Sequence, residues 1–186
     1  IEEASLKAGF QKGQEKDFVD SIVAGFKDAW RVMGIEHDYF IRTTDVGHKK
    51  TVQDYLMKVK ENGDIYLGEY DGYFCKPCET FWTDTQAEGG ICPDCKRTVE
   101  RIKEKNYFFR MSKYAAELEK YINDNPAFVL PGFRKNEVLG YLKEEIRDLC
   151  ISRPKTRMSW GIELPFDKDY VVYVWFDALI NYISAV

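Results

Sequence analysis

The 186 residues carry 27 Lys and Arg against 31 Asp and Glu, so the net charge is −4. With 45% hydrophobic residues, 6 Pro and 13 Gly, the composition excludes a disordered or collagen-like chain and favours one domain, or one core with a smaller insert. No apolar run approaches the roughly 20 residues that span a bilayer, and residues 1–4 do not resemble the start of a signal peptide. The sequence begins without Met, which favours a piece of a longer protein.

Two amphipathic helices and two short strands are predicted in the first third of the chain. Apolar residues recur at helical spacing over 16–34 and again over 46–62. Gly34 ends the first of these patterns. The short runs at 39–43 and 64–67 contain β-branched and aromatic residues, which predict strands.

The middle of the chain has a different composition. Residues 68–106 are rich in Gly, Asp, Thr and Cys and show no helical period, which predicts an insert of loops and ribbon. Two helices are predicted after it, over 112–123 and 134–146. An α/β core interrupted by an insert explains this order more simply than two consecutive domains.

The last predicted elements are a strand and a helix. The uninterrupted apolar and aromatic run 170–176 predicts a strand buried on both faces, as in a parallel sheet. Asp177 is predicted to cap a final helix over 178–185. Ligands of open parallel sheets bind beyond the carboxyl ends of strands, so this segment is a candidate ligand site. The alternative is that Trp175 is a core residue and Asp177 only a helix cap.

Four of the five cysteines form two Cys-x-x-Cys pairs, Cys75/Cys78 and Cys92/Cys95, separated by thirteen residues. Each pair lets two thiolates bind one metal ion from a tight turn, and four thiolates complete a tetrahedral shell with no open position. This predicts structural Zn2+; a redox pair, an iron–sulfur cluster and unrelated cysteines are the alternatives. The odd count without a secretory signal predicts a reducing compartment, namely the cytoplasm.

Charge is distributed unevenly around these cysteines. Residues 61–94 are mostly acidic, whereas 95–113 are mostly basic and include Tyr107-Phe108-Phe109. The basic stretch suggests contact with RNA, and a solvated strand and turn is the simpler alternative. His37 and His48 have no spaced partner and are interpreted as ordinary surface or helix residues.

At this point several strings, in matching order, identify a family. The chain resembles the bacterial methionyl-tRNA synthetases, which are class I aminoacyl-tRNA synthetases. The matching segments run almost from end to end: 40–44, 63–70, the cysteine pairs, 107–114, 151–153, 160–162 and 174–179.

The resemblance implies a fold and a domain order. It implies a mixed α/β fold, a partial Rossmann-type catalytic core with an inserted zinc-knuckle connective domain. Residues 1–67 are then part of the first catalytic half, 68–147 the connective insert with its zinc knuckle at 75–95, and 148–186 the start of the second half.

The resemblance also implies a function and a substrate site. Members of this family are enzymes that use ATP and Mg2+ to activate methionine and transfer it to tRNA-Met. The matching positions of the methionine pocket are Trp175, Ala178, Leu179 and Tyr182, with Asp177 in the same segment. Arg153 matches an arginine near the active site, to which no contact is assigned.

The sequence lacks the active-site motifs of the family. The HIGH-type and KMSKS-type sequences that hold ATP do not occur in these 186 residues. Because stabilisation of the adenylation transition state needs such groups, this polypeptide alone is predicted to be inactive and to contain no catalytic residue. The alternative functions are a non-enzymatic zinc-ribbon RNA-binding module and a subunit of a split synthetase.

Overall fold

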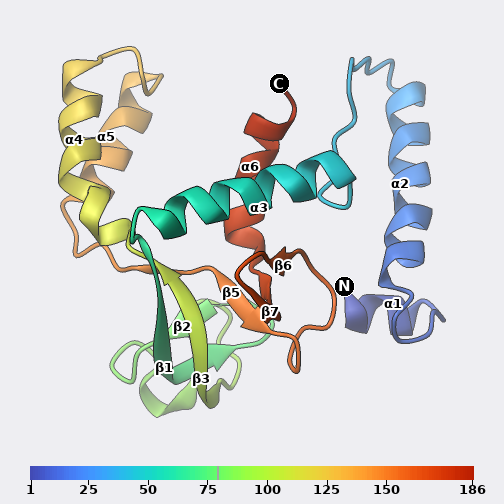
Figure 1. Cartoon of the computed structure of the whole chain (residues 1–186), viewed down its shortest axis with the longest axis horizontal. Coiled ribbons are helices and arrows are strands. Elements are labelled where there is room, and N and C mark those ends of the chain that lie inside the picture. The colour runs from blue at the N-terminus through green and yellow to red at the C-terminus, as the bar shows by residue number, and fades with distance from the viewer. Residues whose placement is uncertain (79) are drawn as a thin grey trace. The chain divides into compact units, whose positions relative to one another are not determined.

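The computed structural model describes residues 1–78 and 80–186, without the side chains of Glu2 and Glu3. The chain divides into two units. The first joins Ile1–Glu61 to Ile151–Val186, and the second is the continuous segment Asn62–Cys150 (Figure 1). The predicted insert, 68–147, lies inside the second unit, which begins earlier and ends later than the prediction.

Four helices belong to the first unit. They are α1 (Glu2–Lys7), α2 (Glu15–Val32), α3 (Val46–Glu61) and α6 (Val174–Ser184). The helices predicted over 16–34 and 46–62 are confirmed as α2 and α3, each ending one or two residues earlier than predicted. Within the described part of the chain, no helix combines the length and the apolar character that crossing a membrane requires.

The strand predicted at residues 39–43 is wrong, since residues 39–42 have no regular secondary structure and a turn at residues 43–44 leads into α3. The Asp45 carboxylate accepts a hydrogen bond from the Arg42 backbone N–H at 3.0 Å, and the Asp45 carbonyl accepts the first helical bond from Lys49. Arg42 is also ion-paired to Asp20 of α2 at 2.6 Å. These local contacts set the turn, and strand propensity without a pairing partner does not overcome them.

A small antiparallel sheet forms the rest of the first unit. Its strand order is β5 (Ser152–Pro154), β7 (Asp167–Val172), β6 (Glu163–Leu164). The prediction of a parallel-sheet strand over 170–176 is therefore wrong: β7 ends at Val172, and α6 begins at Val174. Because β7 is the central strand, its last residues are buried, and this pattern is shared with strands of parallel sheets.

The core of the first unit lies where α3 packs against α6 and the small sheet (Figure 1). His48, Val52 and Leu56 follow one another at every fourth position of α3 and are buried. The buried apolar side chains that face them from the remainder of the unit are Ile151, Ile162, Leu164, Val171, Val172, Tyr173 and Ile180.

A long antiparallel ribbon forms the second unit. Strand β1 (Ile65–Cys75) pairs with β3 (Glu100–Phe109) from Ile65 opposite Phe109 to Phe74 opposite Glu100. The short strands β2 (Thr80–Trp82) and β4 (Leu149–Cys150) complete the sheet order β2-β1-β3-β4. The strand predicted at 64–67 is thus the beginning of the much longer β1.

A helical hairpin follows the ribbon. The 3-10 turn η2 (Met111–Tyr114) leads into α4 (Ala115–Asp124), which packs beside α5 (Gly132–Leu142). The two helices predicted here are confirmed, although α5 ends four residues before the predicted end at 146. A second 3-10 turn, η1 (Glu88–Gly90), lies between the two cysteine pairs.

Two carboxylates anchor the base of the ribbon. Asp64 is 1% exposed and accepts hydrogen bonds from Lys113 Nζ at 2.7 Å and from the Tyr114 hydroxyl. Asp148 accepts hydrogen bonds from the Ser112 hydroxyl at 2.6 Å and from the Tyr66 hydroxyl at 3.0 Å. The hydrogen bond from Lys113, followed by that from Tyr114, lowers the pKa of Asp64 below its ordinary value.

Asp64→Asn is expected to lower the melting temperature more than Glu69→Gln. Asp64 is buried and is the counter-charge of Lys113, whereas the Glu69–Lys103 pair at 2.8 Å is exposed. Because its pKa is lowered in the folded state, ionised Asp64 stabilises the fold above about pH 4. This contribution is lost as the pH falls through the folded-state pKa. The deficit of Asp64→Asn, measured by thermal unfolding, should therefore shrink in acid. Equal losses for the two variants at pH 7 would contradict the anchoring role.

Candidate functional site

The four cysteines of the two predicted pairs come together in the second unit. Their sulfur atoms all lie within 4.8 Å of one another, with Cys75 Sγ 3.5 Å from Cys95 Sγ and Cys92 Sγ 3.9 Å from Cys78 Sγ. A tetrahedral shell with metal–sulfur bonds of about 2.3 Å has edges of about 3.8 Å, so this spacing fits one metal ion. Among the described residues, this is the one such group of metal-binding side chains.

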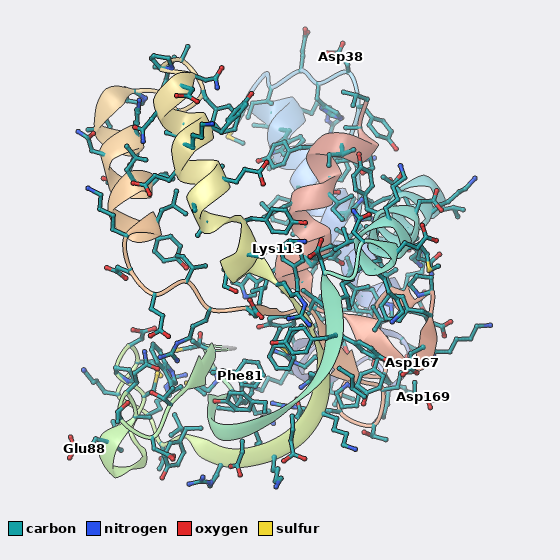
Figure 2. The ribbon with its side chains drawn as sticks, turned by 60° about the vertical axis from the view of Figure 1, so that its left-hand side comes forward. Asp38, Phe81, Glu88, Lys113, Asp167 and Asp169 are labelled. Atoms are coloured by element: carbon teal, nitrogen blue, oxygen red, sulfur yellow. The ribbon has the colours of Figure 1, made fainter. Side chains whose placement is uncertain are left out.

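The backbone shapes the second pair as a tight turn. Lys96 has a φ of 60°, unusual for a residue with a side chain, and its backbone N–H donates to the Cys92 carbonyl at 3.0 Å. The Cys92 N–H in turn donates to the Arg97 carbonyl at 2.8 Å. Gly89 and Gly90, with φ of 71° and 72°, supply the preceding bend. Figure 2 shows Glu88 of this segment at the outer end of the loops.

The environment of the sulfur atoms favours thiolate at one position. Burial by itself raises the pKa of Cys92, but the backbone N–H groups of Cys95 and Asp94 counteract it, and the pKa falls to about 7. Cys75 and Cys92 are fully buried, and Ala87 and Val99 pack against them. Four cysteine sulfur atoms around one point leave no open coordination position, which suits a structural ion rather than a catalytic one.

The ribbon beside the cysteines is stabilised by aromatic contacts. Phe81 of β2 lies over β1, with ring centroids 4.3 Å from Tyr70 and 5.1 Å from Phe74 (Figure 2). The Tyr70 hydroxyl donates to the carbonyls of Tyr73 and Trp82, both at 2.9 Å. These contacts hold Cys75, the last residue of β1, next to the turn that contains Cys78.

Part of the basic stretch 95–113 is paired with nearby carboxylates. Arg101 pairs with Asp71 at 3.1 Å and with Asp84 at 3.3 Å, and Lys103 pairs with Glu69 at 2.8 Å. The acidic partners lie on β1 and in the segment after β2, so they are distant in sequence order but adjacent across the ribbon. The positive charge counted along the chain therefore overstates the attraction for RNA.

The predicted methionine-pocket residues lie on α6. Trp175, Leu179 and Tyr182 are 58%, 66% and 81% exposed, and their spacing puts them on one face of the helix. Ala178 is half-buried beside them. The prediction that Asp177 is the N-cap is wrong, because the helix begins at Val174 and Asp177 lies within its first turn.

Asp177 is instead a buried carboxylate. It is 9% exposed, and its Oδ1 atom contacts no hydrogen-bond partner in the part of the chain that the structure describes. Burial raises the pKa of Asp177 to about 6, although a hydrogen bond from the Ala178 backbone opposes the shift. Asp177 therefore faces away from the exposed apolar side chains of α6.

Arg153 and His48 are further buried polar side chains of the first unit. The Arg153 guanidinium lies 3.7 Å from the centroid of the Tyr173 ring and donates to the Ser152 carbonyl at 2.7 Å. His48 is 2% exposed, and its Nδ1 lies 2.8 Å from Ser184 Oγ. The interpretation of His48 as an ordinary surface or helix residue is right about the helix and wrong about the surface, since its spacing from Val52 and Leu56 places it on the buried face of α3.

The comparisons with known proteins identify the family. The model for "tRNA synthetases class I (M)" matches residues 2–103 and 97–186, so the chain belongs to this family of class I synthetases. The chain is 56% identical over 171 residues to a methionine–tRNA ligase of Clostridium acetobutylicum, a match that covers 91% of this chain and 26% of that protein. A methionine–tRNA ligase of Thermotoga maritima is 48% identical over 186 residues, with 97% of this chain and 29% of that protein covered.

A solved structure is similar as well. The methionyl-tRNA synthetase of Mycobacterium tuberculosis bound by methionyl-adenylate superposes with a TM-score of 0.84 at 31% identity, covering 99% of this chain and 36% of that chain. The predicted mixed α/β fold of class I synthetases is thereby confirmed. The chain spans between a quarter and a third of the length of the two curated relatives.

Asp177→Asn is expected to stabilise the chain at pH 7 but to change little at pH 4. A carboxyl group whose folded pKa is raised favours folding below its unfolded pKa of about 4, and this contribution is lost as the pH rises through about 6. Thermal unfolding of both proteins between pH 4 and pH 7.5 tests this, with the exposed Asp17→Asn as control. A difference in melting temperature that is independent of pH would contradict the burial of a neutral carboxyl group.

Proposed function

We propose that this chain works as part of a methionine–tRNA ligase, an enzyme that activates methionine with ATP and transfers it to tRNA-Met. The observation that supports this most is the 56% identity over 171 residues to a methionine–tRNA ligase. ATP and Mg2+ would be bound with the help of segments present in longer relatives. The cytoplasm is the proposed location, because the reaction serves translation.

The proposed methionine contact is the exposed apolar face of α6. Trp175 and Tyr182 would form aromatic walls beside the thioether, since sulfur contacts aromatic rings favourably. Ala178 and Leu179 would leave room for the unbranched side chain between them. The similar Mycobacterium tuberculosis structure contains methionyl-adenylate, which is consistent with this assignment. Asp177 is proposed to act from behind this face, because its carboxylate is buried.

We propose that the 68–147 segment is the connective insert of the catalytic domain and that Cys75, Cys78, Cys92 and Cys95 hold structural Zn2+. The zinc ion would cross-link the two turns through four thiolates, with no position left for water. The paired carboxylates of Arg101 and Lys103 weigh against the alternative of a separate RNA-binding module.

Cys95→Ser is expected to abolish zinc binding, whereas Cys150→Ser retains it. Cys95 belongs to the sulfur cluster, while Cys150 lies in β4 and pairs with Phe108 of β3. One zinc per chain should be found by elemental analysis of the wild type and of Cys150→Ser, and a chelator should lower the melting temperature of both. A wild-type chain with no bound metal, or with metal retained in Cys95→Ser, would refute the proposed zinc site.

The 186-residue polypeptide is expected to show no methionine-dependent exchange between ATP and pyrophosphate, whereas a full-length protein carrying these residues should show it. The sequence here contains neither a HIGH-type nor a KMSKS-type motif. Trp175→Ala in the full-length protein should raise the KM for methionine with little effect on that for ATP, because it removes a wall of the proposed pocket. Exchange activity with a different amino acid would overturn the proposal.

A further inference from the structure

Helix α6 exposes several large side chains and places polar ones, together with the buried Ile180, on its inner face. Its exposed face is formed by Trp175, Leu179 and Tyr182, which are large and apolar or aromatic. Its inner face carries a polar series two residues further along the chain at the same helical spacing: Asp177, Asn181 and Ser184. A helix held only by burial of apolar area would have the opposite arrangement.

The inner face meets a histidine of α3. His48 Nδ1 lies 2.8 Å from Ser184 Oγ, and this hydroxyl also donates to the Asn181 carbonyl at 3.4 Å. Burial lowers the pKa of His48, opposed by the charge of Asp45, so the ring is neutral near pH 7. The contact joins residues 136 positions apart in the sequence, and it is directional in a way that the neighbouring Val52 and Leu56 contacts are not.

This polar seam, defined as His48, Asp177, Asn181 and Ser184, is costly for folding. His48 Nε2, Asp177 Oδ1 and Asn181 Oδ1 are buried and meet no hydrogen-bond partner among the described residues. Apolar side chains at these positions would pack without that desolvation penalty. Polar groups at a helix interface can fix its register, which apolar packing leaves less strictly defined.

We propose that His48 and Ser184 are positioning residues that fix the rotation of α6 about its axis and thereby place Trp175 and Tyr182 for methionine. This inference rests on the proposed function. Side chains reach about 6 Å from a helix axis, so a rotation of 10° moves their ends by about 1 Å. Displacements of that size are enough to weaken a closely fitted site strongly.

The test uses a full-length protein that carries these residues, assayed by methionine-dependent exchange between ATP and pyrophosphate. Ser184→Ala and His48→Gln should each raise the KM for methionine by about tenfold, while the KM for ATP and kcat change less than about twofold. His48→Asn should restore the KM, because its amide occupies the place of Nδ1, whereas the glutamine amide occupies that of Nε2. The double variant His48→Gln with Ser184→Ala should be no worse than either single change.

Two controls separate positioning from general damage. Ser21→Ala removes a hydroxyl that donates to the carbonyl three residues earlier at 2.7 Å, the same local bond that Ser184 makes, but on exposed α2. Loss of folded protein would lower kcat and leave both KM values unchanged, which would overturn the inference. It would also be overturned if Ser184→Ala behaved like Ser21→Ala or if His48→Asn were no better than His48→Gln. A wild-type protein without methionine-dependent exchange would instead overturn the proposed function itself.

Discussion

The pairing of β1 with β3 and of β3 with β4 is the constraint on which the second unit depends. A segment that leaves one unit at Asn62 and returns at Cys150 must bring its two ends together, and closing so long a loop is entropically unfavourable. The strand register brings the two ends together, because Ile65 and Leu149 both lie opposite Phe109. Asp64 and Asp148 then bind the same turn at the base of the ribbon, one from each end of the excursion.

The ribbon also determines where the two cysteine pairs lie at its other end. Hydrogen bonds between β1 and β3 continue as far as Phe74, so the first cysteine pair begins where the ladder stops. The second pair sits on the returning segment, and the Ile91–Thr98 bridge closes its turn. The two turns at this end of the β1–β3 ladder place the four sulfur atoms within 4.8 Å of one another. In the proposed zinc site, the ion would cross-link the two turns, so its binding would contribute directly to the stability of the fold.

Features set by residues close together in the sequence were predicted correctly, whereas features set by residues far apart in the sequence were not. The apolar residues of α2 and α3 recur at helical spacing, so these helices were predictable. The spacing within the two Cys-x-x-Cys pairs likewise predicted that the four cysteines come together. The segment 39–43 has strand propensity but no pairing partner, and Asp45 converts it to a turn. The run 170–176 divides between β7, which ends at Val172, and α6, which begins at Val174, and a short apolar run does not reveal such a boundary because its periodicity fits either element. His48 could not be assigned a role from the sequence, since its partner Ser184 is distant in the chain.

In α6, stability and the proposed binding role oppose each other. Trp175, Leu179 and Tyr182 are exposed, where they contribute little to folding, whereas Asp177 is buried, where it costs free energy. Replacing Asp177 by an apolar residue would remove this cost, whereas polar residues at Trp175 and Tyr182 would remove the apolar surface of the proposed methionine contact. The remaining apolar contacts of α3 through Val52 and Leu56 offset this cost, because they bury full side chains next to the polar seam. In the described residues, α3, the small sheet and Ile180 of α6 supply the buried apolar side chains, and the outer face of α6 carries the proposed methionine contact.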